Sequence, residues 1–269
     1  MLELYYYENS VCSERVLMTL AEKGIADWER HHIDLFKGEQ ANPEYVKLNP
    51  KAQVPTLVHD GRVIRESSII CDYLDDAFPH PPLKPAAPAD RARLREWVKE
   101  ADEAGFQGVA SLSFTAVFRE RLLNMDPAER DRLWAEQTDP ARTFRQKSCV
   151  FEGLDSPHAI IALTAWERIF TDLELTLSDN RHWIMGTDFT LADLNLAPFV
   201  ARLEGMAFLD IWCDGRPASA AWWQRMKARP SYGKAKVGPG LGDEQATFAR
   251  EGAKIAGEAR QRLHELSMP

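Results

Sequence analysis

Two serines near the start of the chain could carry chemistry, because both lie at a turn where a helix is predicted to begin. Ser10 and Ser13 are the first and last residues of the segment Ser10-Val11-Cys12-Ser13, and they occupy the two cysteine positions of a thioredoxin CxxC frame. A hydroxyl there can stabilise a thiolate: a hydrogen bond to a charged acceptor contributes about 1.5–3 kcal/mol and a helix N-terminus about 0.3–1 kcal/mol. Such a serine more commonly caps its helix. Cys12 alone is more often a small buried hydrophobe than a reactive thiol.

A second group of candidate residues is formed by Gln53-Val54-Pro55 and Glu66-Ser67. The bond before a proline can be cis at a cost of only about 0.5–1 kcal/mol, and a cis Val54-Pro55 bond would turn the backbone N–H and C=O of Val54 outward. The alternative is a trans proline that starts an edge strand. Glu66-Ser67 opens a predicted helix, where an acid and a hydroxyl suit the unpaired N–H groups and where anions bind.

The first 78 residues contain the elements that would position these side chains. Apolar and aromatic runs predict strands over residues 2–7, 28–35, 55–58 and 62–64, and helical spacing predicts helices over 16–24, 42–48 and 66–78. His59-Asp60-Gly61, between the last two strands, is a strong hairpin signal. The order βαβαββα is that of a thioredoxin-like domain, so we expect an α/β N-terminal domain over 1–78.

The chain changes character after this domain. Residues 79–88, PHPPLKPAAP, contain five prolines in ten positions, which predicts a stiff linker over 79–89. Beyond it, residues 90–236 predict an all-α domain, with helices over 90–123, 158–177, 191–203 and 218–227. Residues 124–157 form a polar insertion, which we expect to be irregular, with breaks at Asp126-Pro127 and Asp139-Pro140. Residues 237–269 predict a C-terminal tail that is helical and loosely packed at best.

Composition excludes several classes of function. Lys and Arg number 33 against 41 Asp and Glu, and the net charge of -8 disfavours nucleic-acid or anionic-membrane surfaces, which need a positive protein face. The four cysteines lie far apart and form no Cys/His cluster, so we expect neither a metal site nor a disulfide framework. The start MLELYYYENS does not fit a signal peptide, and no apolar run is long enough to span a membrane. These features predict a soluble cytoplasmic protein.

Two stretches resemble the soluble glutathione transferases. Residues 34–74, DLFKGEQANPEYVKLNPKAQVPTLVHDGRVIRESSIICDYL, resemble the glutathione-binding half, with KGE, NP, QVP, DG and ES in their usual order and spacing. Residues 186–204, GTDFTLADLNLAPFVARLE, resemble the capping-box segment of the family's helical domain. With the order of the two lobes, the resemblance covers most of residues 1–236. It implies the glutathione transferase fold, a thioredoxin-like domain followed by an all-α domain.

The resemblance implies roles for the second group of residues, with glutathione as co-substrate. In the family, the backbone at the Val54 position pairs with the cysteinyl part of glutathione, and this context favours a cis bond to Pro55. The Ser67 position and its helix N-terminus hold the γ-glutamyl carboxylate, while Glu66 would face the γ-glutamyl ammonium. Gln53 would donate to the same end of the peptide.

The glycyl end of glutathione would lie near Gln40. Related classes often carry a histidine at this position that reaches the glycyl carboxylate, and the neutral Gln40 would instead offer a hydrogen bond. Lys37 or Lys51 could supply a positive charge, although a solvated surface lysine is the commoner case.

The residue that activates the thiol has several candidates. Alignment with serine- and cysteine-type transferases places Ser10 on the usual catalytic position, whereas alignment with bacterial β-aryl etherases places Ser13 on theirs. Tyr6 or Tyr7 is the rival, since several classes use a tyrosine at the end of the first strand. A single hydroxyl is enough, because lowering a thiol pKa of about 8.5 by two units requires only about 2.7 kcal/mol.

The substrate class is indicated by the insertion 124–157 and by residues 59–79. Both are more similar to the glutathione-dependent β-aryl ether cleaving branch of proteobacteria than to detoxifying transferases. This branch implies thiolate attack on a carbon that bears an aryl ether beside a ketone, with a phenolate leaving. The expected contacts of this hydrophobic aromatic electrophile are Tyr7, Phe114 and Phe118, although plain core packing is the alternative for the phenylalanines.

Other functions remain open from the sequence. One alternative is a general transferase, dehalogenase or peroxidase that acts on halides, epoxides or peroxides. Another is a non-catalytic binding module with the same fold. The resemblance also implies a homodimer.

Overall fold

The computed structural model describes residues 1–236, 238 and 241–267, so positions 237, 239, 240, 268 and 269 of the predicted tail lie outside the described residues. The chain divides into two compact units. The first comprises Met1–Val98, His182–Pro198 and Trp223–Leu241, and the second comprises Lys99–Arg181, Phe199–Trp222 and Gly242–Pro269. The first unit thus adds helical segments to the expected α/β domain 1–78, and the proposed domain boundaries themselves stay a prediction.

A four-stranded sheet in the order β2-β1-β3-β4 forms the centre of the first unit. The strands are β1 (Leu2–Tyr6), β2 (Glu29–His32), β3 (Thr56–His59) and β4 (Arg62–Arg65). β2 runs parallel to β1, while β3 is antiparallel to both β1 and β4. Alternate residues of β1 are buried, as expected for a strand that covers a core with one face.

The hairpin between β3 and β4 confirms the turn signal in the sequence. Asp60 and Gly61 both have positive φ angles, 49° and 77°. Two consecutive residues of this kind form a type I′ turn, whose twist matches that of the flanking strands. Aspartate and glycine tolerate this conformation, which explains why the chain can reverse here in two residues.

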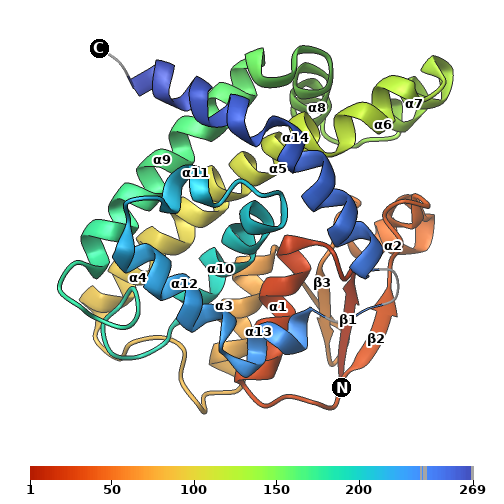
Figure 1. Cartoon of the computed structure of the whole chain (residues 1–269). Helices are drawn as coiled ribbons and strands as arrows, with labels where there is room; N and C mark the ends of the chain where they lie inside the picture. Colours follow the sequence, from red (N-terminus) through yellow and green to blue (C-terminus); the bar gives the residue numbers. More distant parts are fainter. Residues whose placement is uncertain (237, 239–240, 268–269) are drawn as a thin grey trace. The chain divides into compact units, whose positions relative to one another are not determined.

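Helices complete the first unit. Those of the α/β part are α1 (Val11–Glu22), α2 (Pro43–Leu48) and α3 (Ser67–Ala77), with a 3₁₀ turn at Glu39–Ala41 before α2. Figure 1 shows α1 and α3 side by side against the sheet. The order βαβαββα agrees with the expected thioredoxin-like arrangement. The short α13 (Pro230–Ala235) packs against α1 in the same unit.

The proline-rich segment is anchored to the first unit by a buried ion pair. Lys23, after the end of α1, lies 2.7 Å from Asp75 of α3, and neither side chain is more than 5% exposed. Asp75 also accepts a hydrogen bond from the backbone N–H of Leu83, at 2.8 Å. Leu83 itself is buried. The segment is therefore fixed against α1 and α3 before Pro88 begins the next helix.

Helices α4 (Pro88–Glu100), α10 (Leu191–Gly205) and α12 (Pro217–Lys227) contribute to both units, and α14 gives its first residue, Leu241, to the first unit. The remaining elements of the second unit are a π-helical turn (Ala101–Gly105), α5 (Phe106–Ala116), α6 (Phe118–Asn124), α7 (Pro127–Ala135), α8 (Pro140–Glu152), a 3₁₀ turn (Gly153–Asp155), α9 (Pro157–Leu177), α11 (Asp210–Cys213) and α14 (Leu241–Ser267).

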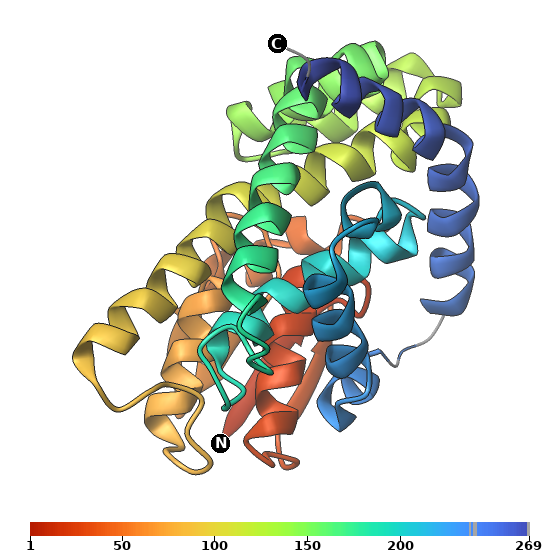
Figure 2. The same ribbon diagram turned by 60° about the vertical axis from the view of Figure 1, so that its left-hand side comes forward.

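The core of the second unit forms where α5 and α9 lie side by side (Figure 2). A Cβ at Gly108 of α5 would lie 2.6 Å from Nε1 of Trp166, so this position requires glycine. Phe170 of α9 stacks on Trp212 of α11, with ring centroids 6.2 Å apart. All three aromatic side chains are fully buried.

The expectation of an irregular insertion over 124–157 is wrong, because the segment folds into α7 and α8. Asp126 and Asp139 are the N-caps of these helices, and their carboxylates accept hydrogen bonds from backbone N–H groups of the first turn. Pro127 and Pro140 occupy the first helical positions, where the missing N–H costs nothing. The Asp-Pro pairs thus begin helices, and Trp134 of α7 is buried.

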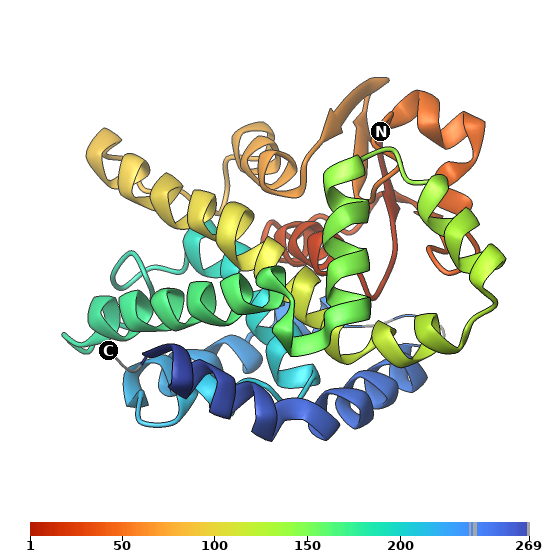
Figure 3. The same ribbon diagram turned by 90° about the horizontal axis from the view of Figure 1, so that it is seen from above.

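The expectation of a loosely packed tail is also wrong for the described residues of that segment. α14 buries Phe248, Ala259 and Leu263. Lys254 of α14 pairs with Glu120 of α6 at 2.8 Å, and Figure 3 shows the two helices together. A Cβ at Gly252 would lie 2.0 Å from the carbonyl oxygen of Met206, so the helix backbone approaches the end of α10 closely.

Candidate functional site

The two candidate serines at the turn between β1 and α1 differ in their exposure to solvent. Ser10 is the N-cap of α1, is half-buried, and accepts a hydrogen bond from the backbone N–H of Ser13 at 3.3 Å. Ser13 has no exposed surface, and its hydroxyl accepts from the backbone N–H of Tyr7 at 3.3 Å. The capping role is therefore real for Ser10. An accepting hydroxyl keeps its own proton to donate, so capping and anion binding are compatible at Ser10.

Tyr7 and Val54 belong to one buried cluster together with Tyr45. The ring of Tyr7 lies 5.7 Å from that of His32 and 6.1 Å from that of Phe36, and only 8% of the residue is exposed. This cluster brings the end of β1 beside the segment that enters β3. Burial accounts for the ring of Tyr7 as core packing, and a direct contact with substrate stays a prediction.

Gln53, Val54 and Pro55 form a rigid entry to β3. The Val54-Pro55 bond is cis, as expected from the motif. The carbonyl oxygen of Gln53 accepts two hydrogen bonds, from the hydroxyl of Tyr45 at 2.6 Å and from Nδ2 of Asn49 at 2.7 Å. Burial raises the pKa of Tyr45 to about 12, so this donor is neutral. Within the described residues, the Val54 backbone makes no hydrogen bond, which leaves its N–H and C=O able to pair with an extended peptide.

Glu66 and Ser67 lie at the N-terminus of α3. Glu66 has a φ angle of 68°, in the left-handed region that non-glycine residues seldom adopt and that often marks a functional position. Its carboxylate pairs with Lys51 at 2.6 Å, and both side chains are about half-exposed. Ser67 is buried and accepts a hydrogen bond from Nη1 of Arg15 at 3.3 Å. The helix end, the hydroxyl and the guanidinium together favour an anion.

Arg15 is the site residue that the sequence reasoning missed. It lies in α1 among apolar residues, is only 1% exposed, and also donates from Nε to the carbonyl oxygen of Asn195 at 2.9 Å. Arg15 thus joins Ser67 to the first turns of α10. Its one signal in the sequence is a position directly before the apolar run of a predicted helix, which suggests burial but does not identify a partner.

The capping box of α10 confirms the second motif. The Asp193 carboxylate accepts hydrogen bonds from the N–H of Thr190 at 3.1 Å and of Ile184 at 2.9 Å. The Thr190 hydroxyl in turn accepts from the N–H of Ala192 at 3.2 Å. These bonds satisfy N–H groups that a buried helix end would otherwise leave unpaired, and they fix the carbonyl of Asn195 that holds Arg15.

Comparisons with known proteins agree with this geometry. Residues 9–77 match the glutathione S-transferase N-terminal domain and residues 152–230 match the corresponding C-terminal domain. Protein LigF of Sphingobium sp. strain SYK-6 is 31% identical over 248 residues, which cover 86% of this chain and 91% of LigF. The chain belongs to the glutathione S-transferase family. The family uses glutathione as co-substrate.

A second relative and a solved structure extend the comparison. A tetrachloro-p-hydroquinone reductive dehalogenase of Sphingobium chlorophenolicum is 30% identical over 246 residues, covering 88% of this chain and 96% of that protein. The crystal structure of the β-etherase LigF superposes with a TM-score of 0.78 at 29% identity, covering 87% of this chain and 98% of LigF. The fold is that of the glutathione transferases, with a small mixed sheet followed by a helical domain.

Lys37 and Gln40, expected near the glycyl end of glutathione, differ in their surroundings. Lys37 is exposed and pairs with Asp34 at 3.0 Å; the hydrogen bond to Asp34, helped by its charge, raises the pKa of Lys37. The negative charge of Asp34 therefore offsets part of the positive potential that Lys37 could offer to a ligand. Gln40 is half-buried, and its Oε1 is buried without a hydrogen-bond partner within the described residues. Gln40 therefore has unused capacity to accept a hydrogen bond.

Aromatic residues of the second unit, Phe114 and Phe118 among them, form an apolar cluster, and their contact with substrate stays a prediction. The rings of Phe114 and Phe118 lie 5.0 Å apart, and Phe248 of α14 lies 5.4 Å from Phe118. The guanidinium of Arg202 lies 4.2 Å from the centroid of the Phe248 ring. Phe114 and Phe118 are half-buried, so they are available to pack against a ligand. Sequence reasoning assigned no part to Phe248, because the tail was expected to be loose.

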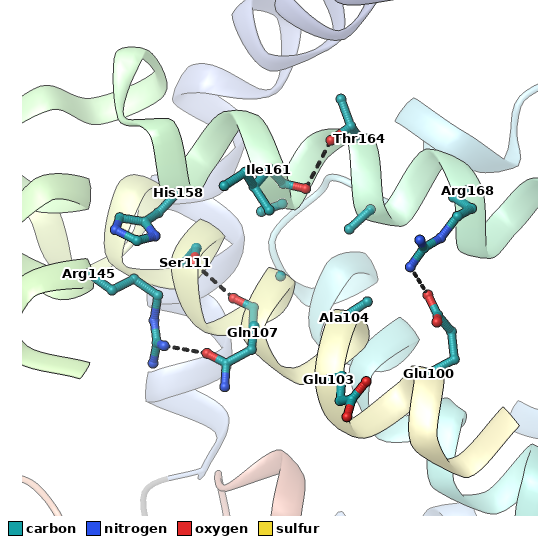
Figure 4. A pocket seen from close by; sticks show the side chains of 13 residues that line it. Glu100, Glu103, Ala104, Gln107, Ser111, Arg145, His158, Ile161, Thr164 and Arg168 are labelled. Carbon is teal, nitrogen blue, oxygen red and sulfur yellow. Dashed lines mark hydrogen bonds and ion pairs between the residues drawn. The ribbon is translucent and has the colours of Figure 1, made fainter. Parts of the chain in front are cut away.

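A separate cavity of about 760 Å³ lies between α5, α8 and α9. Figure 4 shows Arg168 of α9 reaching Glu100, and Arg145 of α8 reaching Gln107. Ile161 lines the cavity and is 63% exposed. None of the residues predicted to bind glutathione lines this cavity.

In the described part of the chain, no helix combines the length and the apolar character that a bilayer span requires.

Proposed function

We propose that this chain is a glutathione transferase in which Ser10 stabilises the glutathione thiolate for attack on a hydrophobic aromatic electrophile. The observation that carries the proposal is the position of Ser10. It is a half-buried hydroxyl at the N-terminus of α1, beside the end of β1. Ser13, the alternative, has no exposed surface. Of the two serines, only Ser10 can therefore contact a bound thiol without a rearrangement of the turn.

The energy that Ser10 must provide is modest. A thiol with a pKa of about 8.5 is only a few per cent ionised at pH 7, and a shift of two units corresponds to about 2.7 kcal/mol. A hydrogen bond to the thiolate contributes about 1.5–3 kcal/mol and the N-terminus of α1 about 0.3–1 kcal/mol. These two contributions suffice, so no general base is required.

The peptide would be held along the edge of the first unit. The Val54 backbone would pair with the cysteinyl residue as a short extended strand. The γ-glutamyl carboxylate would bind at the N-terminus of α3 through Ser67, with Gln53 donating to the same end. Glu66 would exchange its contact with Lys51 for the γ-glutamyl ammonium, while the side-chain NH2 of Gln40 would donate to the glycyl carboxylate.

For the electrophile we propose the β-aryl ether ketones. The relative LigF, a β-etherase, matches this chain over most of both proteins, and its crystal structure superposes with a TM-score of 0.78. In this reaction the thiolate sulfur forms a bond to the carbon that bears the ether oxygen, the C–O bond breaks, and its electron pair leaves on a phenolate. The half-buried Phe114 and Phe118 provide apolar surface that suits an aryl group.

The reductive dehalogenase supports a second candidate, because it matches as much of this chain at nearly the same identity. A halogenated hydroquinone would also present an aromatic ring to the phenylalanine cluster. A substrate screen decides between the candidates: β-aryl ether ketones, halogenated hydroquinones and peroxides, each with glutathione.

Release of phenolate with formation of a glutathione thioether is the expected result. Turnover of halides or peroxides without ether cleavage would contradict the etherase proposal, while the broader proposal of a glutathione transferase would stand. Glutathione binding without turnover of any of these substrates would indicate a non-catalytic module.

We also propose a cytoplasmic homodimer, which is the typical state of the family. The cavity between α5 and α9 is the candidate face, since Ile161 exposes apolar surface there beside charges of both signs, Glu103 and Arg145. A two-fold axis would place the same patch of both subunits together, so that opposite charges can meet.

A further inference from the structure

Three side chains on β1 and β2 form a cluster that the proposed transfer reaction does not use. Glu3 pairs with Glu29 in the parallel register of the two strands, and Tyr5 pairs with His31. Because alternate residues of a strand share a face, Glu3 and Tyr5 lie on the same face of the sheet as Glu29 and His31. The carboxylates of Glu3 and Glu29 and the imidazole of His31 approach one another closely enough to hold one metal ion.

The distances in this cluster fit a tetrahedral ion. Nε2 of His31 lies 3.3 Å from Oε2 of Glu3 and 3.4 Å from Oε1 of Glu29. A Zn²⁺ ion with bonds of about 2.0–2.2 Å separates neighbouring tetrahedral ligands by about 3.3–3.6 Å. The two His31 contacts therefore have the length of tetrahedral edges around an ion placed between the three side chains.

The hydrogen-bond geometry of His31 points the same way. Its Nε2 atom is buried, yet it makes no hydrogen bond to any described residue, although both carboxylates are near. A nitrogen aimed between two carboxylates without a good hydrogen bond to either is arranged as a metal ligand would be. Tyr5 holds the ring in this position, since the two rings are stacked at 4.2 Å with an angle of 9° between their planes.

Charge also favours a cation at this place. Among the described residues, no lysine or arginine nitrogen lies within 4.0 Å of the Glu3 or Glu29 carboxylate. The hydroxyl of Tyr5 donates to Glu3 at 3.5 Å, which orients that ligand from behind.

We propose that Glu3, Glu29 and His31 bind one divalent ion of the Zn²⁺ class and so cross-link β1 to the edge strand β2. An imidazole with two carboxylates suits Zn²⁺ better than Ca²⁺ or Mg²⁺, which prefer oxygen ligands alone. Three protein ligands leave one tetrahedral position for water. The sequence does not reveal the site, because Glu3 lies far from Glu29 and His31 along the chain and only the parallel pairing of the strands brings them together.

The test titrates metal-free, full-length protein with Zn²⁺ and with Co²⁺, without glutathione, because free thiols bind both ions. Calorimetry is expected to show one equivalent of Zn²⁺, and Co²⁺ is expected to develop the visible absorption of a four-coordinate site. His31→Ala and Glu29→Gln should each weaken binding by at least about tenfold. His264→Ala and Glu44→Gln are matched controls, since both residues are exposed and lie outside the cluster, and they should bind as the unchanged protein does.

The melting temperature gives a second readout. Zn²⁺ should raise it in the unchanged protein and in the controls but not in His31→Ala, because an ion that binds only the folded state stabilises that state. Glu29 is 53% exposed, so Glu29→Gln should fold even if His31→Ala does not. Absence of stoichiometric binding, binding that persists in Glu29→Gln, or a cobalt–thiolate absorption band would each overturn the proposal.

Discussion

At the turn after β1, two serines three positions apart have different hydrogen-bond environments. Ser10 caps α1 and stays half-buried, whereas Ser13 has no exposed surface and pairs with the N–H of Tyr7. If Ser10 donates to the thiolate, Ser10→Ala should raise the pKa of bound glutathione by about one to two units. Below that pKa, less thiolate is present, so kcat/KM for a model electrophile should fall about 10- to 100-fold. At a pH well above it, the variant should approach the unchanged enzyme.

Ser13→Ala is the matched control for this prediction. It removes the hydroxyl that accepts from the buried N–H of Tyr7, which should lower the free energy of unfolding by about 1–3 kcal/mol without moving the thiol pKa. The pH profile of kcat/KM and urea denaturation separate the two effects. A shifted pKa in Ser13→Ala, with none in Ser10→Ala, would mean that Ser13 is the activating residue.

The carboxylate of Glu66 gives a second prediction at the residue scale. Glu66→Gln removes the charge proposed to face the γ-glutamyl ammonium, and a charged hydrogen bond of about 1.5–3 kcal/mol corresponds to a 10- to 100-fold weaker Kd for glutathione. Stability should change by less than about 1 kcal/mol, because both Glu66 and its partner Lys51 are about half-exposed. Calorimetry with glutathione measures the affinity.

Lys51→Met distinguishes the charge of Glu66 from its ion pair. This variant breaks the pair but keeps the carboxylate, so glutathione should bind equally well or more tightly. Weaker binding in Lys51→Met, together with normal binding in Glu66→Gln, would place the ligand contact on Lys51 instead.

Individual residues show where sequence reasoning succeeds and where it stops. The capping role of Ser10 follows from a local pattern, because it depends on neighbours in the chain. The cis bond before Pro55 was expected only from the resemblance to the family, since the tripeptide alone does not distinguish cis from trans. Arg15 could not be assigned, since its partners Ser67 and Asn195 belong to distant segments that only the fold brings together. The burial of Ser13 likewise depends on packing.

At the scale of elements, hydrophobic spacing predicted the long helices and the strands, but not the elements of residues 124–157. The Asp-Pro pairs of this segment were interpreted as breaks, although an N-cap aspartate followed by proline is also a common helix start. The described part of the tail was judged loose because it has few large apolar residues. α14 instead packs through Phe248 and Leu263 together with small residues, Gly252 and Ala259, which a count of large side chains overlooks.

Gly252 tests the packing of α14. Gly252→Ala would place a Cβ 2.0 Å from the Met206 carbonyl oxygen, a backbone atom that cannot easily move. We expect a loss of about 1–3 kcal/mol in unfolding free energy from overpacking, despite the better helix propensity of alanine. Gly257→Ala is the control on the same helix, because no atom lies within 4 Å of its Cβ position. It should stabilise the protein by up to about 1 kcal/mol. Equal effects of both variants in urea denaturation would exclude this close approach.

The anchor of the proline-rich segment makes another prediction for elements. Asp75→Asn leaves Lys23 buried without its charge partner, and the free energy of unfolding should fall by about 3–5 kcal/mol. Asp76→Asn, next in the chain and 70% exposed, should cost less than about 1 kcal/mol. Thermal or urea unfolding compares the two, and a small effect of Asp75→Asn would show that the segment is held mainly by Leu83 and its prolines.

At the scale of the whole molecule, the net charge of -8 must coexist with an anionic co-substrate. The N-terminus of α3 and Arg15 supply positive potential where the γ-glutamyl carboxylate is proposed to bind, whereas Lys37 and Lys51 are already paired with acids. Local helix ends and one buried guanidinium can therefore offset an unfavourable total charge, because exposed charges beyond about 8–10 Å are screened at physiological salt.

The proposed homodimer provides the prediction for the whole molecule. Light scattering should give twice the 30.5 kDa mass of one chain. Ile161→Glu places a charge on the candidate face beside the cavity between α5 and α9, and should shift the mass to that of a monomer, because burying an unpaired carboxylate in an interface is costly. Leu175→Glu is the matched control, since Leu175 lies on the same helix, is 73% exposed and is not among the residues that line the cavity. A monomeric unchanged protein would contradict the dimer, and dissociation by Leu175→Glu alone would move the interface to the other end of α9.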